Sequence, residues 1–392
     1  MLKAVLSYPM HPEHGIVTVS FPIPSEEYDR TLQLLEDVDI GDVLLRDCHV
    51  IELDSRYPIL KCLESTVVNV DELDYLAKRL ESFCKSEGGQ FQAMAHKLDL
   101  SDITDLINLT FFCQQATVIA DFSDLEAVGR AHYMNVHGGC TVDRELANLD
   151  GHETALLLID SGAGVVTPYG VVYDNGMKLE QLYDGRYFPS YLYGPSVMAV
   201  EARSDGGTVG CFCLPMPARQ LQRTQERAGL DNPDIPLKDV MDELPEETAN
   251  ALDLDRLTLG DLADLNRLCQ IIGTLKSPDD RKKLDAVVCA AHPDRIDRIQ
   301  MLAENLELFD FVPDVHSPEE YGRYMIQQSG RFEYDENLAD FYDYRLCGEQ
   351  CVREESGRFN AHGYVAYRGI LTLEELMADE PAERQALGPQ MM

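Results

Sequence analysis

The strongest constraint on how this chain folds is an internal repeat with an offset of 193 residues. The segments SDLEAVGR and HSPEEYGR end at Arg130 and Arg323, and their glycines, Gly129 and Gly322, keep the same spacing. Further pairs at this offset are Gly164 with Gly357, Gly170 with Gly363, Ile103 with Ile296 and Leu106 with Ile299. With a slip of one residue, a second set is Leu73 with Leu265, Leu76 with Leu268 and Leu80 with Ile272. Matches in one register along the whole chain predict a tandem duplication of one module.

The repeat also predicts the domain boundaries. The first copy is expected at residues 1–184, with subdomains at about 1–58, 59–110 and 111–184. The second copy is expected at residues 196–377, with subdomains at about 196–250, 251–306 and 307–377. Residues 185–195, GRYFPSYLYGP, have no counterpart after the second copy and are interpreted as a linker, whose four aromatic side chains indicate a docked segment. Residues 378–392 are interpreted as a C-terminal tail.

Local patterns predict both strands and helices in each subdomain. Residues 3–24 are expected to form two short strands, because apolar and polar side chains alternate from Val17 to Pro24. Ser25 is expected to cap the next helix, whose apolar stripe comprises Tyr28, Leu32 and Leu35.

Two capping boxes predict further helix starts, at Asn69 with Glu72 and at Ser123 with Glu126. Residues 155–159 and 165–173 are predicted as two strands of a hairpin, joined through the glycines at 162 and 164. Small subdomains of this kind in series predict an elongated, multi-domain α+β chain that contains two tandem copies of one module.

The chain is strongly acidic. Its 69 Asp and Glu residues outnumber 33 Lys and Arg residues, which gives a net charge of −36. Residues 1–193 hold 31 acids and 13 bases, and residues 194–392 hold 38 and 20, so each half carries −18. Such a surface repels nucleic acid and anionic membranes, and it attracts proteins whose working surface is basic. The charge therefore favours a functional acidic surface over solubility alone.

Positions that are acidic in both copies are the candidates for this surface. At the 193 offset they are Asp54 with Glu247, Asp121 with Asp314, Glu126 with Glu319, Asp143 with Glu336 and Asp150 with Asp343. With the slip of one residue they are Asp39 with Asp231, Asp42 with Asp234 and Asp47 with Asp239. Two alternatives stay open: Glu126 and Glu319 also fit first-turn acids that stabilise a helix, and the acids from 39 to 47 also fit a solvated loop.

The cysteines and histidines do not form a recognisable metal or disulfide pattern. Eleven cysteines is an odd count, no Cys-x-x-Cys pair occurs, and the cysteines are not retained between the copies, so reduced thiols are expected. The metal-like spacings are Cys211 with Cys213, Cys347 with Cys351, and the group His132, His137, Cys140 and His152. We expect no metal site and no cofactor.

Sequence motifs of common enzymes are absent. The chain has no phosphate loop ending in Gly-Lys-Ser/Thr, no Gly-x-Ser-x-Gly elbow and no His-Glu-x-x-His motif. An enzyme is therefore not expected, although a metal-dependent hydrolase that uses carboxylates stays open as an alternative. The first 20 residues lack a basic start, and no apolar run approaches the ~20 residues of a membrane helix, so a cytoplasmic protein without membrane contact is expected.

Several longer segments resemble one family when they are taken together. In the first copy they are the FPI strand with its acidic helix (21–37) and the leucine-rich helix preceded by acids (71–80). In the second copy they are GDLADLNRL (260–268), PEEYGRYMIQQSG (318–330), LADFYDY (338–344) and GRFNAHGYV (357–365). Each copy in this way resembles the ArdA antirestriction proteins. Residues 121–126 and 314–320 lie nearest to that family's acidic antirestriction stretch.

The resemblance implies a function. Members of that family are small acidic proteins that form elongated, curved dimers, imitate bent double-stranded DNA and block the DNA groove of type I restriction-modification enzymes. This chain would then be an anti-defence protein of a mobile genetic element that binds such an enzyme, or another DNA-binding protein, without binding nucleic acid itself. Its two copies would form a pseudo-dimer within one chain, with a homodimer of the whole chain still open. The alternative is an acidic adaptor or inhibitor of another basic protein of DNA processing or anti-phage defence.

Overall fold

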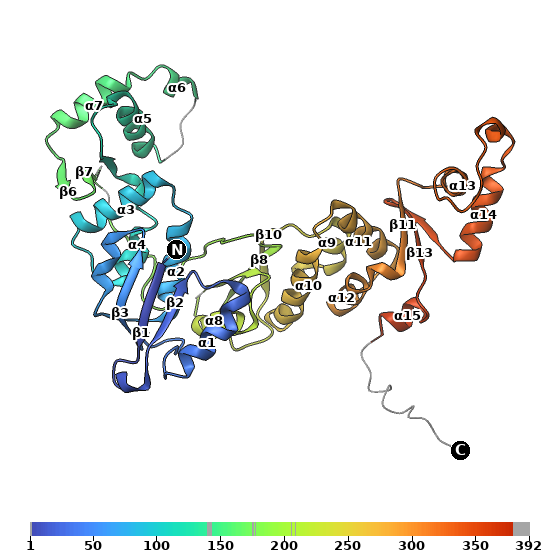
Figure 1. The fold of residues 1–392 in the computed structure, drawn as a ribbon, viewed down its shortest axis with the longest axis horizontal. Coiled ribbons are helices and arrows are strands. Elements are labelled where there is room, and N and C mark those ends of the chain that lie inside the picture. The colour runs from blue at the N-terminus through green and yellow to red at the C-terminus, as the bar shows by residue number, and fades with distance from the viewer. Residues whose placement is uncertain are drawn as a thin grey trace. The chain divides into compact units, whose positions relative to one another are not determined.

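A computed structural model of the chain describes residues 2–138, 143–174, 176, 178–204, 206–207 and 209–378. The chain divides into two compact units, whose elements are labelled in Figure 1. Unit 1 comprises Met1–Tyr191 and Pro217–Gly229, and unit 2 comprises Leu192–Met216 and Leu230–Met392. The described parts contain four small antiparallel sheets with helices packed against them, which confirms the expected mixed α+β class with several small subdomains. Every helix in these ranges is too short or too polar to cross a membrane.

Unit 1 begins with a four-stranded sheet in the order β2-β1-β3-β4. Its strands are β1 (Leu2–Ser7), β2 (Val17–Phe21), β3 (Cys48–Ser55) and β4 (Val67–Val68). The expected pair of strands before residue 24 is confirmed, and alternate residues Leu2, Ala4 and Leu6 of β1 are buried. Helix α1 (Tyr28–Glu36) buries the stripe expected from the sequence. Ser25 does not cap this helix, because residues 25–27 form a 3-10 turn that precedes it.

Three helices complete the core on which this sheet packs. They are α2 (Val70–Glu81), α3 (Lys85–Lys97) and α4 (Ile103–Leu109). The start of α2 is the predicted capping box, because Asn69 accepts from the N–H of Asp71 and Glu72 accepts from the N–H of Asn69. Leu73, Leu76 and Leu80 of α2 are buried in the shared core. A sequence-local cap and a helical apolar stripe thus fix this helix together.

The remaining sheet of unit 1 has the order β5-β7-β6 and carries two crossing helices. The elements are β5 (Thr117–Ile119), α5 (Leu125–Val136), α6 (Asp143–Ala147), α7 (Gly151–Asp160), β6 (Val165–Thr167) and β7 (Gly170–Tyr173). Residues 165–173, predicted as one strand, form a hairpin by themselves, β6 with β7. The predicted pairing with residues 155–159 is wrong, because those residues are helical. Asp150 caps this helix by accepting from the N–H of Glu153, and an apolar run alone cannot distinguish a strand from a buried helix.

Unit 2 contains sheets in the orders β10-β8-β9 and β11-β13-β12. Its strands are β8 (Met198–Arg203), β9 (Val209–Leu214), β10 (Leu237–Asp242), β11 (Phe309–Pro313), β12 (Arg358–Asn360) and β13 (Gly363–Tyr367). Its helices are α9 (Glu246–Leu252), α10 (Leu262–Thr274), α11 (Pro278–Ala291), α12 (Ile296–Glu304), α13 (Pro318–Gln327), α14 (Tyr344–Glu355) and α15 (Leu373–Leu376). The predicted tail lies outside the described residues from position 379 onward.

The 193-residue offset recurs in strand register and in helix packing. Ile119 pairs with Val171, and Val312 pairs with Tyr364, in sheets of the same strand order. Helices α5 and α7 cross at Gly129, where an added Cβ would lie 1.8 Å from the carbonyl oxygen of Gly151. Helices α13 and α14 cross at Gly322 in the same way. This agreement is what a duplicated module predicts, and the duplication itself stays a prediction.

Helix α8 (Ala218–Ala228) distinguishes the two units from the two predicted copies. It follows β9 and falls within the predicted second copy, yet residues 217–229 belong to unit 1. The aromatic residues before Leu192 also pack within unit 1. The ring of Phe188 stacks between those of Tyr75 and Tyr183, with centroids 4.5 and 4.8 Å away. The aromatic linker is therefore docked, as its composition indicates.

The helix crossing at Gly322 yields a stability prediction. We expect Gly322→Ala to destabilise the protein by about 1–3 kcal/mol, because its Cβ would lie 1.7 Å from the carbonyl oxygen of Tyr344 and the backbones must separate. The matched control is Gly89→Ala in α3, where a Cβ meets nothing within 4 Å. That change is expected to stabilise by roughly 0.5–1 kcal/mol, because alanine is the better helix former. The melting temperatures of both variants measure these effects. Equal changes in the two would contradict the close approach of the backbones at Gly322.

Candidate functional site

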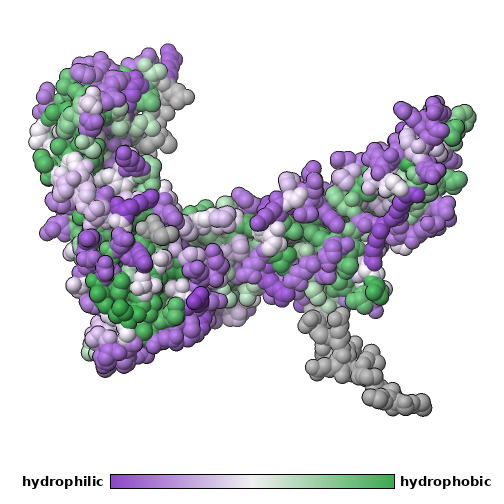
Figure 2. Space-filling view, in the orientation of Figure 1, coloured by the Kyte–Doolittle hydropathy of each residue, from purple (hydrophilic) through white to green (hydrophobic). Residues whose placement is uncertain are grey.

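Most of the candidate acids lie on the surface. The exposed ones are Asp39, Asp42, Asp54, Asp121, Glu126, Asp150, Asp231, Asp234, Asp314, Glu319, Glu336 and Asp343. Asp239 and Glu247 are half-buried, and Asp47 is buried. The side chain of Asp143 lies outside the described residues. Figure 2 shows hydrophilic residues over much of the visible surface of both units. The exposed members therefore fit an acidic surface, whereas buried or half-buried members such as Asp47 and Glu247 make contacts inside the protein.

Asp47 stabilises the loop that precedes β3. Its Oδ2 accepts hydrogen bonds from the N–H groups of Gly41 and Asp42, both at 2.8 Å. Burial raises the pKa of Asp47, and these two hydrogen bonds oppose that effect. Asp42 in turn accepts from the N–H groups of Leu44 and Leu45 at 2.7 Å. With 8% of its surface exposed, Asp47 cannot belong to an exposed acidic surface, and sequence alone gave no signal of its burial.

Other candidate acids have local structural roles as well as exposure. Asp150 and Asp343 cap α7 and α14 at equivalent positions, each accepting from the N–H three residues later. Glu126 was expected to form a capping box with Ser123, but Asp124 is the cap, accepting from the N–H of Ala127. Glu126 instead binds Arg130 and accepts from the N–H of His152. These carboxylates are therefore held in fixed positions at helix starts.

Four cations of unit 1 are largely withdrawn from its surface. The side chains of Arg227, Arg223, Lys78 and Lys97 are 6%, 12%, 16% and 17% exposed. Their partners are Asp71 for both arginines, Asp74 for Lys78 and Asp174 for Lys97. In unit 2, Glu355 binds Arg331 and accepts from the hydroxyls of Tyr321 and Tyr364. Part of the positive charge thus serves internal contacts, while most candidate acids face solvent.

Helix α8 places two of these arginines against the loop and helix start of unit 1. Arg223 donates to both carboxylate oxygens of Asp71, at 3.1 and 2.9 Å, and to the carbonyl of Gly41 at 2.6 Å. Arg227 donates to Asn69, to Asp71 and to the carbonyl of Val43, and its guanidinium lies 4.8 Å from the ring centroid of Phe188. Arg223 and Arg227 of α8 therefore bind backbone carbonyls of the loop and the carboxylate at the start of α2.

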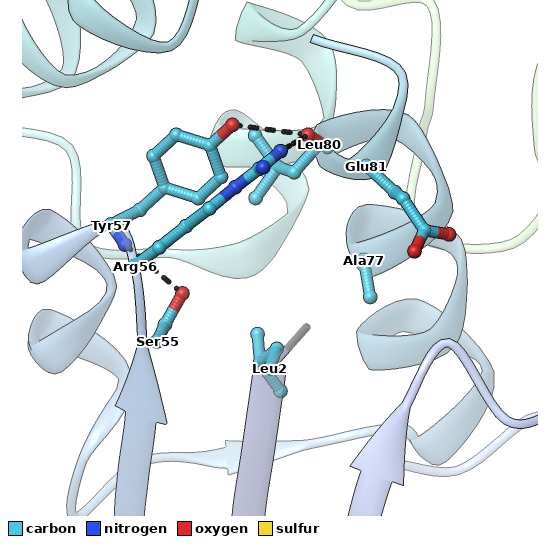
Figure 3. Close-up of a pocket in the computed structure, with 7 residues that line it drawn as sticks. All are labelled: Leu2, Ser55, Arg56, Tyr57, Ala77, Leu80 and Glu81. Atoms are coloured by element: carbon cyan, nitrogen blue, oxygen red, sulfur yellow. Dashed lines mark hydrogen bonds between the residues drawn. The ribbon is translucent and has the colours of Figure 1, made fainter. Parts of the chain in front are cut away.

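A small hollow beside β1 and α2 does not resemble a substrate pocket. It is lined by Leu2, Ser55, Arg56, Tyr57, Ala77, Leu80 and Glu81, as Figure 3 shows, and its volume is about 10 Å³. A space of that size holds about one water molecule. Arg56 and Tyr57 both donate to the carbonyl of Leu80, at 2.8 and 3.1 Å, and so satisfy the C-terminal end of α2. Arg56 and Tyr57 therefore make these hydrogen bonds within the wall of the hollow and not to a ligand.

None of the metal-like spacings of the sequence forms a converging group of three donors among the described residues. The groups whose donor atoms do converge there are His11, Glu13 and His14, and Glu247, Cys289 and His362. Cys140 lies outside the described residues. The second group joins positions far apart in sequence, so spacing alone gave no indication of it. Glu247, expected on the acidic surface, instead lies 3.0 Å from Nε2 of His362.

Comparison with known proteins does not place the chain in a family. No protein-family model matches it, and no curated protein matches it.

The contact of α8 yields a prediction for Asp71. We expect Asp71→Ala to destabilise unit 1 by about 3–5 kcal/mol, because it leaves two largely buried guanidinium groups without their carboxylate. The control is Glu36→Ala, which removes an exposed carboxylate from the half-buried Arg219 and is expected to cost about 0–1 kcal/mol. Hydrogen exchange of the amides of β1 and α2 in denaturant measures both. A loss for Asp71→Ala no larger than that for Glu36→Ala would show that this contact is not structural.

Proposed function

We propose that this chain is a DNA mimic that occupies the DNA-binding groove of a type I restriction-modification enzyme. The observation that carries the proposal is the distribution of charge. The net charge of −36 is divided evenly along the chain, and in unit 1 four of the cations are largely buried against acids. Double-stranded DNA presents one negative charge per ~1.7 Å of its axis, and its binding proteins use Lys and Arg against phosphates. Exposed carboxylates meet the same cations.

The resemblance to ArdA proteins supports the choice of target. Five of the six family segments fall on α1, α2, α10, α13 and the β12–β13 hairpin, so they belong to regular structure in both units. A mimic needs no nucleophile and no cofactor, and it repels DNA. On this proposal the protein acts in the cytoplasm, where its target works, and it inhibits by occupying a groove and not by catalysis. A second DNA-binding protein of similar groove charge is an equally natural target class.

An acidic adaptor for some other basic protein is the alternative. It shares the charge but predicts no competition with duplex DNA for the partner. A plating test separates the activities in cells: unmodified phage should plate more efficiently on a host with a type I system when this chain is expressed. Unchanged plating, together with undiminished binding of the partner in the presence of duplex DNA, would favour the adaptor.

Salt dependence is a prediction of the mimicry. We expect binding to a purified type I enzyme to weaken steeply and progressively with added salt, because ion pairs are screened over ~8 Å near physiological ionic strength. Duplex DNA should displace the protein in the same titration. Binding measured between low and high salt, with and without duplex, checks both expectations. A flat response to salt would count against electrostatic mimicry.

A clustered neutralisation tests the surface directly. Glu333, Glu336 and Asp340 are exposed, and none of them caps a helix. We expect the triple change Glu333→Gln, Glu336→Gln and Asp340→Asn to weaken inhibition by about tenfold, because each exposed ion pair is worth ~0–1 kcal/mol. The charge-preserving control exchanges the same residues as Glu→Asp, Glu→Asp and Asp→Glu. Complete loss of activity from any single neutralisation, with the fold intact, would indicate a local catalytic or metal site instead.

A further inference from the structure

Three side chains of unit 2 with different donor chemistry converge from separate elements. Glu247 lies in the first turn of α9, Cys289 near the end of α11, and His362 in the turn between β12 and β13. Their donor atoms all lie within 4.8 Å of one another, and Oε1 of Glu247 is 3.0 Å from Nε2 of His362. Each of the three residues is half-buried. Because 42 and 73 residues separate them in sequence, the convergence is a product of the tertiary fold.

Helix α11 holds all three residues in place. It carries Cys289, and its core face is fixed by the buried Leu284, Val287 and Val288. Asp285 accepts from the N–H of Glu247 at 2.8 Å, which sets the start of α9 against α11.

The turn that carries His362 is tied to the same helix through Asn360. The side-chain amide of Asn360 donates to the carbonyl of Ala286 at 2.7 Å. Its oxygen accepts from the N–H of His362 at 2.9 Å. The carboxylate, thiol and imidazole are therefore positioned before any ligand binds, which is the feature that distinguishes a built site from a chance cluster.

We propose that Glu247, Cys289 and His362 form a binding site for a divalent transition metal of the zinc class. Thiolate, imidazole and carboxylate are the ligand types that Zn²⁺ takes, with bonds of ~2.0–2.3 Å in tetrahedral geometry. That geometry puts ligand atoms ~3.3–3.8 Å apart, so the three donors need approach one another by no more than about 1.5 Å. The thiol proton of Cys289 passes to solvent on binding. Water completes the fourth position, and the metal links α9, α11 and the β12–β13 turn.

The equivalent positions of the first half cannot form this site. At the 193 offset they are Asp54, His96 and Tyr169, so no thiol is present. The rings of His96 and Tyr169 instead meet edge to face, with centroids 6.4 Å apart. The site therefore belongs to unit 2, and it is independent of the acidic surface proposed above. The other converging group, His11, Glu13 and His14, is exposed and lies within four consecutive residues, and it serves as the control.

Cobalt is the probe that distinguishes the two groups. The full chain, purified without a histidine tag and stripped with a chelator, is titrated with Co²⁺ and then with Zn²⁺. We expect one equivalent to bind with a thiolate-to-cobalt absorption band that Zn²⁺ abolishes. Cys289→Ser should remove the band, and His362→Asn and Glu247→Gln should each weaken binding more than about tenfold.

The controls are His11→Asn with His14→Asn, and Cys84→Ser at an exposed cysteine, and all of these should keep the band. Zn²⁺ should also raise the melting temperature of the wild-type chain and of the controls but not that of Cys289→Ser, because a ligand that binds the folded state stabilises it. The site is refuted if the wild-type chain gives no thiolate band, or if the band survives Cys289→Ser. If that variant does not fold, unweakened binding by both His362→Asn and Glu247→Gln refutes the site equally. Inhibition of a DNA-binding enzyme is not a readout here, so failure of this site leaves the mimicry untouched.

Discussion

The first unit depends on one carboxylate, Asp71, which binds two arginines of a helix that follows it by some 150 residues. Arg223 and Arg227 reach Asp71 from α8, and the same two side chains satisfy the carbonyls of Gly41 and Val43. Removing two guanidinium groups from water is costly unless every polar contact is made, and here nearly all of them are. The Nε of Arg227 is an exception, since it is buried without a hydrogen-bond partner. Residues 1–191 are therefore incomplete as a folding unit without 217–229.

The chain has about twice as many acids as bases, and some of its cations are buried in ion pairs. Those cations do not lie among the exposed acids. Ion pairs inside a protein neutralise a buried acid but leave the remaining acids to repel one another. In this protein Arg46 binds Glu72 and Asp102, and Lys97 binds Asp174, so several of its few cations serve folding. The exposed carboxylates at helix starts are oriented by backbone N–H groups. A surface of this kind suits a partner with a basic groove, because its charges are both abundant and fixed in position.

The two halves agree in backbone and differ in side-chain chemistry. Gly170 and Gly363 both have positive φ and both pass close to a carbonyl of the neighbouring strand, of Ile119 and of Val312. Any side chain at either position would clash, so this hairpin geometry is tied to glycine in both halves. The chemistry placed on that common backbone is not shared, as Cys289 and His96 illustrate. Because the side chains differ on a shared backbone, the metal site proposed for one half has no counterpart in the other.

Sequence determined the features that depend on near neighbours along the chain. The capping box at Asn69, the apolar stripe of α1, the two strands before residue 24 and the even division of charge all follow from local spacing or from composition. The apolar run at residues 155–159 fits a strand or a helix equally well. The helix cap at Asp150, several residues earlier, identifies the segment as helical.

Tertiary structure decided everything that required distant segments to meet. The burial of Asp47, the membership of α8 in unit 1, and the convergence of Glu247, Cys289 and His362 leave no periodic trace, because each depends on contacts between residues that are not neighbours in sequence. Periodicity reports which face of an element is buried, but not which other element covers it.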